Sequence, residues 1–288
     1  MNARVPSTRR RQVGAALTEM VIVAPWFLFI VLCIWQAALV YYAKSSVNYA
    51  AFEAARAGSV NGASTTSINV AFQKAMLPYY GGGTTAAELA ATATRAATDL
   101  TAEAVRIEIL SPTVESFSDY NSPALQAALH ETQPVIPNTG LDELLCPRDV
   151  PSCKSDPETN ASGQTLLDAN LLKLRVTYGI PPARQMPMVG KFYTWVLTML
   201  GAGTDDAFKQ ALLLAGRIPV VTSTVIRMQS DAVKNSAMIS SPGKGNDGKP
   251  VPPDPGDPGP VVPQCPWWDP ACSSCTGTSC LPETCGGH

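Results

Sequence analysis

The residues best suited to metal or redox chemistry are the cysteines of the C-terminal end: Cys265, Cys272, Cys275, Cys280 and Cys285. A Cys-x-x-Cys pair, as at 272 and 275, is typical of structural zinc sites, and the other ligands would be Cys280 and Cys285, helped by His288. Such sites usually contain two short pairs separated by a longer loop, and this segment has only one. In an oxidising compartment the same cysteines form disulfides, and their odd number leaves one thiol free or intermolecular. We favour disulfides and predict no metal.

The three remaining cysteines have simpler interpretations. Cys146 and Cys153 lie in a proline-flanked loop, close enough in sequence to form a short disulfide. Cys33 lies in an apolar run, where a thiol behaves as a small hydrophobic residue.

Groups for acid–base or nucleophilic catalysis are few. The sequence has two histidines, His130 and His288, and neither has a serine, cysteine or aspartate at a recognisable motif spacing. The sequence contains no Walker phosphate loop, GxGxxG or HExxH motif. We therefore predict no enzymatic activity and no cofactor.

The charge balance bears on possible partners. The net charge is −2, and charged residues make up 15% of the chain, so no strong positive field attracts nucleic acid. The basic residues do not alternate with aromatic residues in the manner of single-strand binders. The sequence predicts no nucleic-acid partner.

A long apolar segment near the N-terminus predicts a membrane anchor. The 24 residues from Met20 to Ala43 carry no charge and would form about 36 Å of helix, enough for a hydrocarbon core of about 30 Å. Lys44 follows the segment, and four arginines precede it: Arg4, Arg9, Arg10 and Arg11. This asymmetry predicts a single-pass protein of the bacterial inner membrane, with a cytoplasmic N-terminus and a periplasmic or extracellular C-terminal domain.

Three interpretations of this segment compete. A cleaved secretory signal has an apolar region of about 7–15 residues and an A-x-A-like cleavage site, whereas this run is longer and ends in YYAK at 41–44. A twin-arginine signal is indicated by TRRR at 8–11, but the following Gln12 and Val13 fit it poorly. An uncleaved signal anchor is the simplest interpretation of the composition alone.

The third interpretation, beside a cleaved export signal and an uncleaved anchor, explains more of the residues. The arginine-rich leader, Gly14, the sequence AALTE at 15–19 and the apolar helix resemble the class III signal of type IV pilin-like proteins. The resemblance implies that a membrane-embedded prepilin peptidase cuts between Gly14 and Ala15 on the cytoplasmic side.

After that cut, Ala15 would carry the new amino group and Glu19 would lie four residues on, on the same helix face. An unpaired carboxylate costs up to about 2.5–3.5 kcal/mol at the bilayer centre and less near its edge, and the ammonium group of this or a neighbouring subunit would offset that cost. The alternative is that Glu19 only marks the cytoplasmic end of the segment.

The next segment narrows the resemblance. Residues 44–58 are helix formers that reach Gly58, which we expect to end the helix as a C′ glycine. The Gly-x-x-x-x-Glu spacing, the apolar helix and a small-residue helix with Glu-Ala-Ala-Arg resemble the TadE/TadG-like proteins of the tight-adherence (Flp) pilus system. One departure is Met20, where many relatives have an aromatic residue. The resemblance implies a pseudopilin, or minor pilin, whose partners are the membrane, other pilin-like subunits, the pilus-assembly platform and the prepilin peptidase.

Small residues let helices approach closely, which favours association between membrane helices. We predict such helix packing with other subunits at six alanines: Ala37, Ala38, Ala50, Ala51, Ala54 and Ala55.

The region after this helix predicts an α+β domain. Alternating residues predict strands at 105–110 and 171–178, and a third strand is expected at 217–229. Helices are expected at 67–76, at 85–104 with a Thr85–Glu88 capping box, at 188–200 and at 204–215. The helix at 188–200 is too short to span a membrane and should lie in the core or on the surface. The pattern favours a small antiparallel sheet packed on helices, with one face covering the N-terminal helix.

The predicted organisation has five segments. These are a basic leader (1–14), a transmembrane helix with its extracytoplasmic continuation (15–58), a periplasmic α+β domain (59–240), a Pro/Gly-rich linker (241–263) and a Cys/Trp-rich tail (264–288). The linker has too few apolar residues to order itself, so we expect the tail to be disordered apart from its disulfides. An alternative function follows from the tail: a membrane-anchored binding module or adhesin.

Overall fold

The computed structural model describes residues 15–141, 144–151 and 153–243. The predicted leader, with Gly14, therefore lies outside the described residues. So do the linker after Gly243 and the tail, with its five cysteines and their alternative zinc site.

One helix, α1 (Ala15–Val60), contains the apolar run and the alanine-rich continuation without a break. Pro25 lies inside it. The prediction that the helix ends at Gly58 is wrong, because α1 continues to Val60. Gly58 serves close packing instead: a Cβ there would lie 2.8 Å from Ile68 Cγ1 and 2.9 Å from Leu172 Cδ2. The glycine lets α1 approach both the next helix and the sheet.

We expect Gly58→Val to lower the free energy of unfolding by about 1–3 kcal/mol, the usual cost of overpacking a tight contact. The added side chain would collide with Ile68 and Leu172, which are almost completely buried. Urea denaturation of the detergent-solubilised chain measures the effect, and Ala57→Val, at the half-buried neighbouring position, is the matched control. An equal loss in both variants would show that the close approach at Gly58 has no energetic role.

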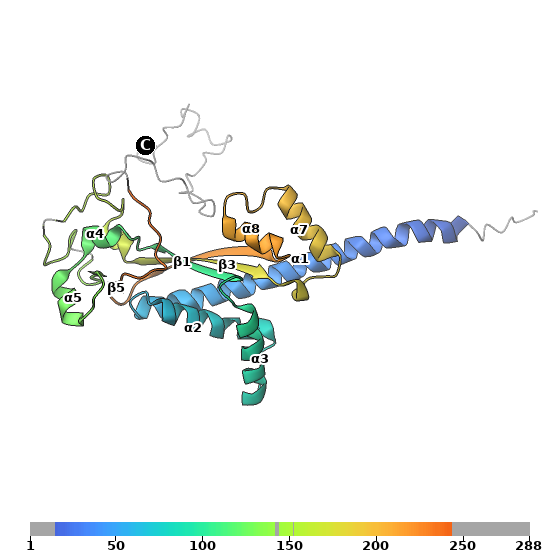
Figure 1. Cartoon of the computed structure of the whole chain (residues 1–288), viewed down its shortest axis with the longest axis horizontal. Coiled ribbons are helices and arrows are strands. Elements are labelled where there is room, and N and C mark those ends of the chain that lie inside the picture. The colour runs from blue at the N-terminus through green and yellow to red at the C-terminus, as the bar shows by residue number, and fades with distance from the viewer. Residues whose placement is uncertain (1–14, 142–143, 152, 244–288) are drawn as a thin grey trace, which may run out of the picture. The chain divides into compact units, whose positions relative to one another are not determined.

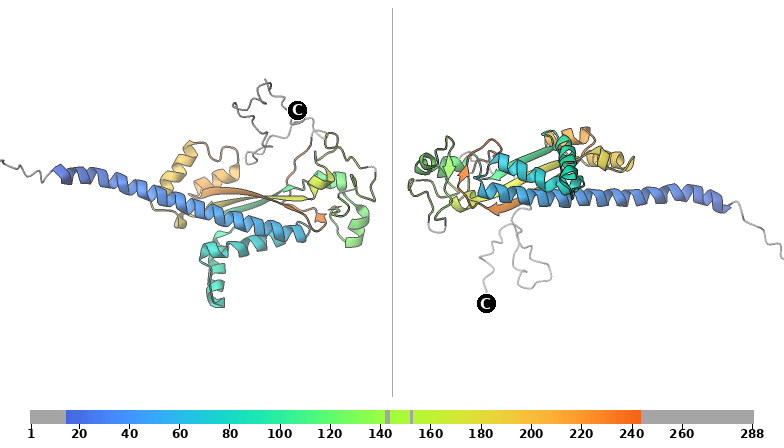
Figure 2. Two further views of the ribbon diagram at one scale, coloured as in Figure 1. Left: turned by 180° about the vertical axis from the view of Figure 1, so that it is seen from behind. Right: turned by 90° about the horizontal axis from the view of Figure 1, so that it is seen from below.

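The sheet has three antiparallel strands in the order β1 (Val105–Ser111), β3 (Leu171–Ile180) and β4 (Ile218–Arg227). The central strand β3 places Ile107 of β1 opposite Val176, and Val220 of β4 opposite Tyr178. Alternate residues of β3 are buried: Leu172, Leu174, Val176, Tyr178 and Ile180. The second half of α1 lies along β3 and β4, so the predicted packing of the sheet on the N-terminal helix is confirmed (Figures 1 and 2).

Helices cover the rest of the core. Helix α2 (Thr65–Met76) follows a short turn after α1 and packs beside it through Ile68, Phe72 and Met76. Helix α3 (Ala86–Asp99) begins with the predicted capping box of Thr85 and Glu88, but it ends earlier than expected. Helices α7 (Val189–Met199) and α8 (Ala207–Leu214) lie between β3 and β4 in the chain. The α+β fold with a long N-terminal helix is thus confirmed.

The stretch between β1 and β3 contains several short elements. They are α4 (Ser116–Tyr120), α5 (Pro123–Leu129), β2 (Val135–Ile136) and α6 (Leu166–Ala169). Strand β2 pairs with β5 (Ala232–Val233) in a second, two-stranded sheet. Two short 3₁₀ helices complete the described part: η1 (Leu77–Tyr80) and η2 (Pro182–Arg184).

Candidate membrane and assembly surface

The first half of α1 exposes an almost continuous apolar surface. Within the described residues, α1 alone is long and apolar enough to cross a membrane. Its exposed large side chains are Met20, Val21, Ile22, Val23, Trp26, Phe27, Leu28, Ile30, Val31, Ile34 and Trp35. A soluble protein rarely leaves so large an apolar surface in water, whereas a lipid bilayer covers it without cost. The composition and exposure of this half fit a single-pass membrane anchor.

The second half of α1 belongs to the domain core. Four of the six predicted packing residues, Ala50, Ala51, Ala54 and Ala55, have no exposed surface, because this chain's own sheet and α2 cover the helix there. Their small side chains serve close packing within the chain. Ala37 and Ala38 are exposed, so association with a neighbouring helix stays a prediction for these two.

The start of α1 preserves the spacing on which the processing prediction rests. Ala15 is the first described residue of the helix, and the Glu19 side chain is exposed one turn later. The helix therefore holds position 15 and the Glu19 carboxylate on one face. Gly14, on the other side of the predicted cut, lies before the described part.

A buried polar side chain in the apolar run of α1 contacts the domain. Gln36 is 1% exposed, and its Oε1 accepts a hydrogen bond of 2.7 Å from the Met186 amide. About two turns earlier on the same face of α1, the ring of Phe29 packs edge-on against Phe192 of α7, with the ring centroids 5.5 Å apart. These two contacts hold α7 and the loop before it against the apolar run of α1.

A polar cluster around a single carboxylate lies inside the domain, at Asp99. Asp99 Oδ1 accepts a 2.8 Å hydrogen bond from Arg217 Nη1, and Asp99 Oδ2 accepts one of 2.9 Å from the Tyr178 hydroxyl and a very short one from Tyr80. The two tyrosine oxygens are 2.9 Å apart. Arg184 stacks over the rings of Tyr79 and Tyr80, 4.4 and 4.6 Å from their centroids.

This cluster is built to connect elements. Burial raises the pKa of both Tyr178 and Tyr80, so their hydroxyls keep their protons and can donate to Asp99. The Asp99 carboxylate, at the end of α3, accepts hydrogen bonds from residues of η1, of β3 and of the turn before β4. These hydrogen bonds join α3 to the sheet. No sequence pattern points to the cluster, since Asp99 and Arg217 lie 118 positions apart and belong to no motif.

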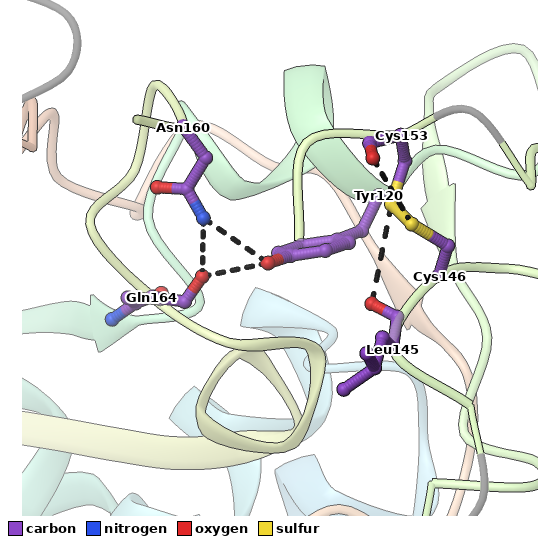
Figure 3. The surroundings of a disulfide bond; sticks show 6 residues. All are labelled: Tyr120, Leu145, Cys146, Cys153, Asn160 and Gln164. Atoms are coloured by element: carbon purple, nitrogen blue, oxygen red, sulfur yellow. Dashed lines mark hydrogen bonds between the residues drawn. A yellow bond between two sulfur atoms is a disulfide. The ribbon is translucent and has the colours of Figure 1, made fainter. Parts of the chain in front are cut away.

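The predicted disulfide between Cys146 and Cys153 is present, with the Cα atoms 5.7 Å apart. It closes a loop near the fully buried ring of Tyr120 in α4 (Figure 3). The Tyr120 hydroxyl donates to the Gln164 carbonyl over 2.7 Å and accepts from Asn160 Nδ2 over 3.1 Å. The disulfide and this hydrogen-bonded tyrosine together hold the long connection between β1 and β3.

We expect the double substitution Cys146→Ser and Cys153→Ser to destabilise this connection by about 2.5 kcal/mol, the chain-entropy value for a loop of this length. Hydrogen exchange followed by mass spectrometry should show faster exchange from α4 to α6 and unchanged protection in β3 and β4. Cys33→Ser is the control, because Cys33 is free and half-buried in α1. Unchanged exchange from α4 to α6 would mean that the disulfide does not stabilise the connection.

No metal centre is found in the described part of the chain: it contains no group of three or more His, Cys, Asp or Glu side chains placed to hold an ion. His130, one of the two histidines considered for catalysis, is the C-cap residue of α5, in a left-handed conformation. The residue is exposed at the end of this helix.

Comparison with known proteins identifies the N-terminal helix. Residues 14–56 match the family model described as TadE-like protein. No curated protein and no solved structure matches the chain. The matched residues begin at the glycine of the predicted cut and run through the exposed apolar half of α1 into its domain-packed half. Over this helix, the chain is therefore similar to TadE-like proteins.

Proposed function

We propose that this chain is a non-enzymatic pilus-assembly protein, a pseudopilin or minor pilin of a tight-adherence pilus or a related secretion system. It would be anchored in the bacterial inner membrane by α1, with the N-terminus in the cytoplasm and the domain outside. The observation that carries the proposal is the division of α1 into an exposed apolar half and a domain-packed half within a TadE-like segment.

The continuous helix gives the proposal a mechanism. The exposed half would associate with other pilin-like subunits and the assembly platform, with Ala37 and Ala38 allowing close approach. The buried half is part of the core, so α1 would transmit any displacement in the membrane rigidly to the domain. The Glu19 carboxylate would pair with the amino group of a processed subunit and set the register between helices.

A processing assay tests the first step of this mechanism. In cells that contain prepilin peptidase, intact mass should show a mature chain that begins at Ala15. Gly14→Val should keep the leader, whereas Val13→Ala, beside the cut, should be processed normally. An intact native leader in peptidase-positive membranes would contradict processing and favour the alternative of an anchored binding module.

A second assay tests association. Glu19→Gln should reduce co-purification with other pilin-like subunits, because it removes the charge that pairs with their amino groups. Glu53→Gln is the matched control, since Glu53 lies on the same helix in its domain-packed half. Equal recovery of partners with both variants would contradict the role given to Glu19.

A further inference from the structure

Helix α7 leaves an apolar face without cover in the described part of the chain. Its side toward the domain packs against the core through Val189, Tyr193 and Leu197. The opposite side and the two residues flanking the helix expose five large apolar side chains: Met188, Phe192, Trp195, Met199 and Leu200. Three of these, Met188, Met199 and Leu200, are more than 70% exposed, at 83, 71 and 77%. A surface helix normally places its polar side outward, so this one is oriented for an apolar surrounding.

The place of α7 beside α1 indicates what that surrounding is. The ring contact between Phe29 and Phe192 fixes where α7 meets the apolar run. Phe29 lies nine residues after Met20 and fourteen after Ala15, which corresponds to about 14 Å and about 21 Å along a helix. Both lengths are shorter than a hydrocarbon core of about 30 Å. A span that begins at Met20 places the contact near the middle of the hydrocarbon core, and one that begins at Ala15 places it in the outer half, so in both cases the contact lies within the depth of the bilayer.

The composition of α7 suits the outer boundary of that bilayer. Its eleven residues are too few to cross a membrane, and Lys191 is the one charged residue among them. An exposed lysine can extend its ammonium group from an apolar surface to the headgroups. Trp195 is of the residue type that anchors proteins at this boundary. Helices with these features lie in the plane of the interface with the apolar face in the acyl chains.

We propose that the exposed face of α7 lies in the outer leaflet of the membrane that α1 crosses, with lipid acyl chains as its occupant. This inference rests on the proposed anchor. The face is continuous with the apolar surface of α1, because Phe29 joins the two helices and Gln36 holds the preceding loop. Two contacts with the bilayer fix both the height of the domain and its rotation about α1, and thus the side that α1 presents to neighbouring subunits.

Fluorescence quenching by brominated lipid tests the inference on the full chain. The five tryptophans are Trp26, Trp35, Trp195, Trp267 and Trp268. A variant keeping only Trp195, with phenylalanine at the other four positions, is reconstituted in phosphatidylcholine vesicles. The lipid is unbrominated, brominated near the glycerol end of one acyl chain, or brominated near its methyl end. We expect a loss of Trp195 emission in brominated lipid that is larger with bromine near the glycerol end.

Two reference variants separate this inference from the anchor. One keeps only Trp35 and reports on α1. The other carries Leu145→Trp in a chain without the native tryptophans and reports on a loop position that is 75% exposed. The Cys146–Cys153 disulfide, detected by mass in non-reduced protein, verifies that each variant has folded.

Quenching of Trp35 and Trp195, with little at position 145, is the expected result. Quenching of Trp35 while Trp195 behaves like position 145 would overturn the inference and leave the anchor intact. Loss of quenching at all three positions would overturn the anchor as well. A blue-shifted, unquenched Trp195 that becomes quenched as lipid is added in excess would show that a second copy of the chain covers the face, which also contradicts the proposal.

Discussion

Two lysines in the first half of α1, introduced by Val23→Lys and Ile30→Lys, should release the chain from the membrane. The side chains of Val23 and Ile30 are more than half exposed, at 59 and 55%, and take no part in the core of the domain. Each lysine costs about 2.5–3.5 kcal/mol at the bilayer centre. The pair should therefore lower the partition into the membrane by on the order of a thousandfold or more.

Alkaline extraction of membranes, followed by detection of the chain in the pellet and the supernatant, measures this effect. Val60→Lys and Val70→Lys form the matched control, since both positions are exposed on helices of the domain side. The control should remain in the pellet like the native chain. Retention of the Val23→Lys, Ile30→Lys variant would show that the apolar half of α1 is not the anchor.

Replacing Asp99 by alanine should destabilise the domain by about 3–5 kcal/mol, the usual cost of removing one partner of a buried ion pair. The Asp99 and Arg217 side chains are only 13 and 20% exposed, so water compensates little. The substitution leaves the Arg217 guanidinium and the hydroxyls of Tyr80 and Tyr178 without their shared acceptor. Urea denaturation of the detergent-solubilised chain measures the loss.

A surface ion pair provides the control for this prediction. Asp205 pairs with Lys209 over 3.1 Å at a position where its own side chain is 44% exposed. Exposed pairs contribute about 0–1 kcal/mol, so Asp205→Ala should change stability far less than Asp99→Ala. Similar losses in the two variants would mean that the Asp99 cluster does not connect α3 to the sheet energetically.

The main elements of this fold are readable from the sequence because burial on one side leaves a periodic pattern. The uncharged run before Lys44 predicts a long helix, and the alternation at 105–110 and 171–178 predicts β1 and β3. The Thr85–Glu88 pair marks the start of α3. The short elements α4, α5, β2 and α6 could not be predicted, because each spans too few residues to establish a period.

Contacts between residues far apart in the sequence limit how much of the candidate site can be predicted. The spacing of Gly14, Ala15 and Glu19, and the local pair Cys146–Cys153, are visible in the sequence. The role of Gly58 depends on Ile68 and Leu172, which only the fold brings to it. Likewise, the sequence does not tell whether the alanines between 50 and 55 pack against a neighbouring helix or against this chain's own sheet. The position of α7 follows from Phe192 and Met186 reaching α1, a contact that no local pattern encodes.

The central claim is that α1 crosses the membrane once and leaves the folded domain outside the cytoplasm. A fusion of alkaline phosphatase after Gly243 tests it most directly, since this enzyme needs disulfides that form only in an oxidising compartment. We predict phosphatase activity that sediments with the membranes. An inactive phosphatase, together with a green fluorescent protein that is fluorescent when fused at the same position, would place the domain in the cytoplasm and contradict the account.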